Sequence, residues 1–125
     1  MKSRENLVRL KQFQVNEKRR QIAQLNLMIA EFDRMANELD AQISAEERKA
    51  GITDINHFAY PTFAKAARLR RDNLKNSQAD LADQKKTAEL LLGEAEAELG
   101  KAEMLQSRDA QMREPEPASR SAMIG

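Results

Sequence analysis

Apolar residues recur every seven positions through the first half of the chain. A second column three residues further on includes Leu25, Phe32 and Leu39, with Lys11, Lys18 and Glu46 toward its ends. A sustained seven-residue apolar repeat is typical of a helix that supercoils with a partner helix. The pattern therefore predicts a long coiled-coil helix over about residues 3–50. Its first column consists of Val8, Val15, Ile22, Ile29, Ala36, Ile43 and Ala50.

The second half of the chain carries a matching pair of columns and predicts a second helix over about residues 61–112. One column consists of Ala67, Leu74, Leu81, Ala88, Ala95 and Ala102. Its companion column consists of Phe63, Arg70, Ser77, Gln84, Leu91, Glu98 and Leu105. If residue i is paired with residue 113−i, Leu39 faces Leu74, Phe32 faces Leu81, and Ala50 faces Phe63. Each apolar column of the first helix then faces a column of the second helix. The expected fold is therefore all-α, a long two-helix antiparallel coiled-coil hairpin.

Glycine and proline mark the predicted boundaries. Gly51 is a natural stop for the first helix, and Pro61 suits the first turn of the second, with a turn over 51–60 between them. After Arg113 the sequence reads Glu-Pro-Glu-Pro-Ala-Ser-Arg-Ser-Ala, which ends the helix. We therefore expect a hairpin over residues 1–112 and a disordered C-terminal tail over 113–125.

Blocks of charge support the same register independently of the apolar pattern. Residues 1–20 hold seven Lys or Arg and two Glu, and the facing block 93–112 holds five acids and two bases. Residues 61–75 hold five bases and one Asp, and the facing block 38–52 holds four acids and two bases. Single surface ion pairs contribute only about 0–1 kcal/mol, so this alternation indicates register rather than stability.

Composition narrows the functional class. The 125 residues are 33% charged and only 4% aromatic, which favours long exposed helices over a globule with a large core. The absence of cysteine argues against a disulfide framework. The net charge of +1 argues against a protein that coats nucleic acid. The chain has one histidine. The sequence has no Gly-rich phosphate loop, no nucleophile beside a base and no His/Cys cluster. We expect no enzymatic activity, cofactor, metal or small-molecule substrate.

Apolar residues outside the predicted seam gather toward the open end of the hairpin, opposite the turn. They lie among Lys and Arg, so they are either scattered surface residues or a docking surface with a basic rim. The candidate partner-binding residues of this open end are Leu7, Leu10, Lys11, Phe13, Arg19, Arg20, Leu92, Leu99 and Met104.

Aromatic residues concentrate at the predicted turn. Phe58, Tyr60 and Phe63 lie within six residues and follow His57. They could seal the hairpin tip as an apolar plug or present a surface to a partner, and different rings could do each. The candidate partner-binding residues of the tip are His57, Phe58 and Tyr60.

The stretches MKSRENLVRLKQFQVNEKRRQIAQL and HFAYPTFAKAARLRRDNL resemble the FliJ family of the bacterial flagellar type III export apparatus, the second stretch its alphaproteobacterial members. The resemblance covers about residues 1–112. It implies a coiled-coil stalk similar to that of rotary ATPases, whose open end docks in the hexameric export ATPase.

The same resemblance implies contacts with the membrane export-gate protein and with export chaperones. It implies a cytoplasmic protein recruited to the cytoplasmic face of the inner membrane at the flagellar base. The hairpin pattern favours a monomer over a dimer. The balanced charge blocks favour the absence of a nucleic-acid partner. Two alternatives remain open from the residues alone, namely a generic cytosolic coiled-coil adaptor and a weak nucleic-acid-binding hairpin.

Overall fold

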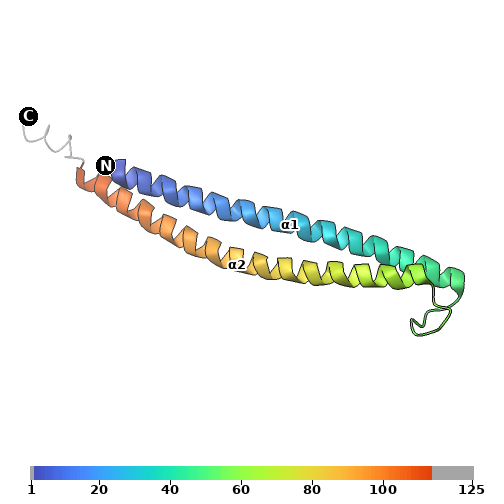
Figure 1. Ribbon diagram of the computed structural model, residues 1–125. Helices are drawn as coiled ribbons and strands as arrows, with labels where there is room; N and C mark the ends of the chain where they lie inside the picture. Colours follow the sequence, from blue (N-terminus) through green and yellow to red (C-terminus); the bar gives the residue numbers. More distant parts are fainter. Residues whose placement is uncertain (1, 114–125) are drawn as a thin grey trace, which may run out of the picture. The chain divides into compact units, whose positions relative to one another are not determined.

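The computed structural model describes residues 2–113 and contains two long helices (Figure 1). Helix α1 spans Lys2–Ala50 and helix α2 spans Thr62–Arg113, with residues 51–61 between them. The expected all-α helical hairpin is confirmed, and each helix end lies within one residue of its predicted position. Arg113 belongs to α2 rather than to the predicted tail, and residues 114–125 lie outside the described residues.

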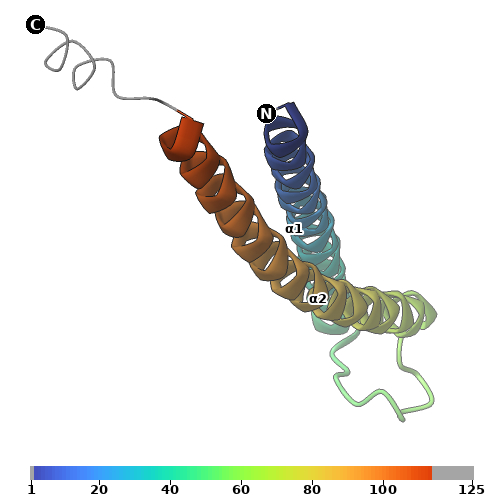
Figure 2. The ribbon, with the colours of Figure 1, turned by 90° about the vertical axis from the view of Figure 1, so that its left-hand side faces the viewer.

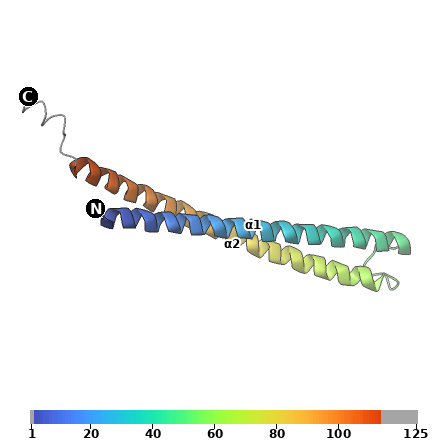
Figure 3. The ribbon, with the colours of Figure 1, turned by 90° about the horizontal axis from the view of Figure 1, so that it is seen from above.

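The chain forms two compact units. Unit 1 combines the start of α1, up to Arg20, with the part of α2 that begins at Glu89, and unit 2 is Gln21–Ala88. Within unit 2 the two helix segments run antiparallel, and the connecting loop projects to one side of their ends (Figures 1 and 2). Within unit 1 the segments also run in opposite directions (Figure 3).

Backbone geometry explains where the helices end and begin. Gly51 has a φ of 71°, a left-handed conformation that glycine adopts without strain. Its N–H and that of Ile52 both donate to the Glu47 carbonyl, at 2.8 and 3.3 Å, which closes α1. Pro61 precedes α2 instead of lying in its first turn, and its carbonyl accepts the Lys65 N–H at 3.0 Å.

The seam of α1 follows both predicted columns as far as Glu46. Val15, Ala36, Leu39 and Ile43 are buried, and most other seam residues are partly buried. Phe32 is only partly buried. Ala50 is exposed, contrary to expectation, and the buried residues at this end of the seam are Tyr60 and Ala64, which are 8% and 0% exposed.

The seam of α2 follows one predicted column and corrects the other. The column from Ala67 to Ala102 is buried or partly buried, but the companion column lies one residue later than predicted. The predicted Phe63, Arg70 and Leu91 are exposed, as are Ser77, Gln84 and Glu98, whereas Leu105 is partly buried. The observed companion column is Ala64, Arg71, Gln78, Lys85, Leu92, Leu99 and Gln106.

Interhelical contacts account for two of the long polar residues in this column, Arg71 and Gln78. The Arg71 guanidinium lies 3.0 Å from the Asp40 carboxylate, and the Gln78 amide donates to the Ile29 carbonyl at 3.1 Å. Polar side chains at a seam are tolerated when their stems pack and their ends are hydrogen-bonded. The column also buries Leu92 and Leu99 in part, in place of Leu91 and Glu98.

Interhelical ion pairs in both units fit the predicted register to within a few residues. Residue numbers add up to 113 for Arg4 with Asp109 in unit 1, and to 111 for Asp40 with Arg71 in unit 2. The charge blocks therefore meet as expected.

Candidate functional site

Two apolar side chains of α1 in unit 1 lie outside the seam and are exposed. Leu10 is 51% exposed and Phe13 is 60% exposed, and residues three apart on a helix lie on the same face. Met104 on α2 is also exposed, at 61%. The geometry agrees with the expectation that these three residues are accessible at the open end.

Phe13 lines a shallow groove between the two helices of unit 1, with a volume of about 380 Å³. On the α2 side the groove is lined by Leu91, which is 39% exposed. We call Leu10, Phe13 and Leu91 the open-end surface. Leu91 was predicted in the seam, and only the one-residue shift of the companion column shows that it is accessible. The other residues that line the groove are Gln14, Glu17, Lys18, Glu94, Ala95 and Glu98.

Three other predicted open-end residues are less accessible. Leu92 and Leu99 are partly buried in the corrected seam, so they offer less surface to a partner than Leu10 and Phe13 do. Leu7 is partly buried beside the seam, as expected for a flanking position.

The predicted cations of the open end have carboxylate partners. Lys11 Nζ lies 2.7 Å from Glu98 Oε2, and Arg19 lies 3.3 Å from Glu96. Arg20 pairs with Glu17 on its own helix. The hydrogen bond from Lys11 is the largest cause that lowers the pKa of Glu98. The rim of this surface is therefore of mixed charge rather than basic.

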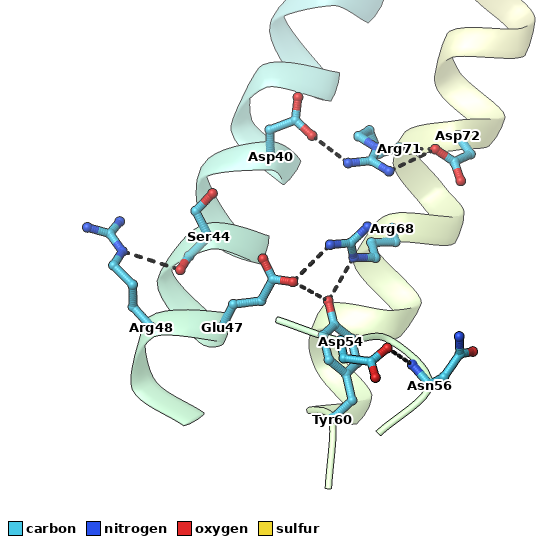
Figure 4. A network of polar contacts seen from close by, with 10 residues as sticks. All are labelled: Asp40, Ser44, Glu47, Arg48, Asp54, Asn56, Tyr60, Arg68, Arg71 and Asp72. Atoms are coloured by element: carbon cyan, nitrogen blue, oxygen red, sulfur yellow. Dashed lines mark hydrogen bonds and ion pairs between the residues drawn. The ribbon is translucent and has the colours of Figure 1, made fainter. Parts of the chain in front are cut away.

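The tip in unit 2 is held by a network around Tyr60 (Figure 4). The Tyr60 hydroxyl donates to Glu47 Oε2 at 3.0 Å and accepts a hydrogen bond from Arg68 Nε at 2.7 Å. Arg68 Nη2 also donates to Glu47 Oε2, at 2.8 Å. Tyr60 therefore acts as the plug of the hairpin tip, and its buried ring is not available to a partner.

Phe58 is the opposite case, with 97% of the residue exposed. Its ring stacks on His57 with 4.7 Å between centroids. His57 Nδ1 accepts the Ala59 N–H at 3.0 Å, and the His57 carbonyl accepts the Tyr60 N–H at 3.0 Å. Asp54 accepts the N–H groups of Asn56 and His57 at 3.0 and 3.1 Å. The loop therefore presents Phe58 on a hydrogen-bonded turn.

The remaining features concern metals and membranes. Within residues 2–113, no group of three or more His, Cys, Asp and Glu side chains could hold a metal ion. No stretch of the described helices combines the length and apolar character that a membrane span requires.

No family model matches the chain, and no curated protein or solved structure matches it either.

Proposed function

We propose that the chain is a non-enzymatic coiled-coil stalk of the bacterial flagellar type III export apparatus. Its open-end surface docks onto the hexameric export ATPase. The observation that carries the docking proposal is the exposure of Leu10 and Phe13, two apolar residues on one helix face that the seam does not need.

Burial of apolar surface is the main favourable contribution to most protein association. Leu10 and Phe13 remain 51% and 60% exposed in the folded chain, so a partner that covers them can still gain this contribution. Leu91 extends the surface from α1 onto α2 across the groove. A partner that contacts both helices would recognise the folded hairpin and not an isolated helix.

The identity of the partner rests on the sequence resemblance to the FliJ family. The same resemblance supports binding to the membrane export-gate protein and to export chaperones, at the cytoplasmic face of the inner membrane at the flagellar base. The long helical hairpin is compatible with a stalk held in a ring.

The experiment is a titration of the purified flagellar export ATPase with the full chain, with ATP hydrolysis as the readout. Leu10→Ser combined with Phe13→Ser should raise the half-saturating concentration about tenfold or more, as expected when central apolar anchors are lost. Circular dichroism should show wild-type helicity, because both residues lie outside the seam.

Leu27→Ser is the matched control, because Leu27 is 72% exposed on the same helix in unit 2. It should leave the titration unchanged. Wild-type stimulation by a folded Leu10→Ser/Phe13→Ser variant would remove the open-end surface from the mechanism. If the ATPase neither binds nor responds to the wild-type chain, the generic adaptor becomes the better proposal. Salt-dependent retention of DNA by the folded hairpin would favour the nucleic-acid alternative.

A further inference from the structure

A second accessible apolar surface lies in unit 2, beside the loop. We call this surface the tip groove, which has a volume of about 430 Å³. Ile55 of the loop and Leu69 of α2 are its most apolar side chains, and they are 39% and 65% exposed. The complete lining is Ile55, Thr62, Lys65, Ala66, Arg68, Leu69 and Asp72.

The corrected seam explains why this face of α2 is open. Ala64, Ala67 and Arg71 face α1, so the residues at 62, 65–66, 69 and 72, which follow a helical period, lie on a different side of the helix. The loop brings Ile55 against that side. The groove therefore combines two segments that the fold holds together.

On α2, the charges around the tip groove that have no ion-pair partner are positive, whereas the Asp54 carboxylate on the loop accepts the Asn56 N–H at 3.0 Å. Arg68 is paired with Glu47, and Arg71 is paired with both Asp40 and Asp72. Within residues 2–113, no carboxylate pairs with Lys65 or with Arg70. Arg70 lies four residues after Ala66, so it borders the groove on the same side of the helix. The first turn of α2 also contains no acidic residue.

We propose that the tip groove binds an acidic, leucine-rich segment of a partner protein. Apolar side chains of the segment pack on Ile55 and Leu69, and its carboxylates pair with Lys65 and Arg70. Charge complementarity selects an acidic occupant, and the concave apolar floor selects a peptide segment rather than a flat lipid surface. Phe58, on the same loop as Ile55, adds an exposed ring to the tip. The inference is independent of the open-end surface, since it uses different residues in the other unit.

The test uses the full chain and a fluorescein-labelled amphipathic peptide with leucine on one helical face and glutamate on the other. Fluorescence anisotropy should show saturable binding, and the NMR signal of the Ile55 methyl groups should shift. Leu69→Ser should weaken the affinity about tenfold, as should Lys65→Glu combined with Arg70→Glu. Raising the salt concentration should weaken binding, because the charged contacts are exposed.

Matched controls lie elsewhere in unit 2. Leu27→Ser and Lys86→Glu replace exposed residues of the same types and should leave the affinity unchanged. A peptide with lysine in place of every glutamate, and one with serine in place of every leucine, should bind at least about tenfold more weakly.

Three results would overturn the proposal. The first is the absence of saturable binding by the acidic peptide, and the second is equal binding by the lysine peptide or by the Leu69→Ser chain. The third is retention of the chain on anionic phosphatidylglycerol vesicles, lost in the Lys65→Glu/Arg70→Glu variant, without binding of the peptide. That result would assign the tip to a membrane surface.

Discussion

Glu47 joins three parts of the tip through different atoms. Its carbonyl accepts the N–H groups of Gly51 and Ile52 where α1 ends. Its carboxylate accepts hydrogen bonds from Tyr60 at the end of the loop and from Arg68 on α2. Removal of this side chain would therefore loosen the loop and the start of α2 together.

Protonation of Glu47 should weaken the tip. The hydrogen bond from Arg68 is the largest cause that lowers its pKa, and the Tyr60 hydroxyl acts in the same direction. Because the folded-state pKa lies below the unfolded value, the stabilisation is present above the unfolded pKa and is lost as pH falls through the folded one. Thermal unfolding followed by circular dichroism should show that acidification below about pH 4 lowers the melting temperature of wild type more than that of Glu47→Gln.

Glu46→Gln provides the control, because the Glu46 side chain forms no hydrogen bond or ion pair with any of residues 2–113. It should retain the wild-type slope of melting temperature against pH. An identical slope for Glu47→Gln would mean that the Glu47 network does not stabilise the folded tip.

At the scale of the element, the orientation of α2 depends on which residues beside the column from Ala67 to Ala102 face α1. The column from Ala67 to Ala102 can be flanked by residues beginning at Phe63 or by residues beginning at Ala64. Both choices contain polar and apolar residues, and the structure adopts the second. Because of this shift, Leu91 is exposed and forms part of the open-end surface, and Arg70 is exposed beside the tip groove.

Adjacent leucines test this shift directly. Leu92→Ala should lower the free energy of unfolding by about 1–2 kcal/mol, because Leu92 is partly buried in the seam. Leu91→Ala should change it by less than about 0.5 kcal/mol, because Leu91 is exposed. Urea unfolding of the two variants measures both values. The reverse order would place Leu91 in the seam and restore the companion column predicted from the sequence.

At the scale of the whole molecule, each of the two units pairs a segment of α1 with an antiparallel segment of α2. Val15 and Ala102 are buried in unit 1, and Leu39, Ile43 and Ala67 form an apolar cluster in unit 2. A hairpin of this kind makes these contacts within one chain, and we expect the protein to be a monomer.

Cysteines at Phe32 and Leu81 should form a disulfide within one chain. Both residues lie in facing seam columns of unit 2, and neighbouring seam side chains come close enough for the bond. After mild oxidation, mass spectrometry should identify the crosslink in monomers on a non-reducing gel. Cysteines at Phe32 and Phe63 should remain free, because Phe63 is exposed and lies far along α2 from Leu81. Crosslinked dimers alone would mean that the helices pair between chains.

The sequence by itself determined the two helices, their ends, their antiparallel pairing and the complete seam of α1 up to Glu46. Those features depend on local signals, namely the apolar repeat from Val8 to Ile43, the glycine at 51 and the proline at 61. It also identified Leu10, Phe13 and Met104 as accessible, because they lie off any seam consistent with that repeat.

Only the tertiary structure decided which companion column of α2 is buried and which aromatic ring closes the tip. Most residues of the column from Ala67 to Ala102 are alanines, which are small enough to pack against α1 with either companion column buried. Contacts with α1 therefore decide which companion column is buried. Arg71 with Asp40 and Gln78 with the Ile29 carbonyl are such contacts, and local spacing does not encode them. Tyr60 is buried and Phe58 exposed for the same physical reason, since only the Tyr60 hydroxyl reaches Glu47 and Arg68 across the hairpin.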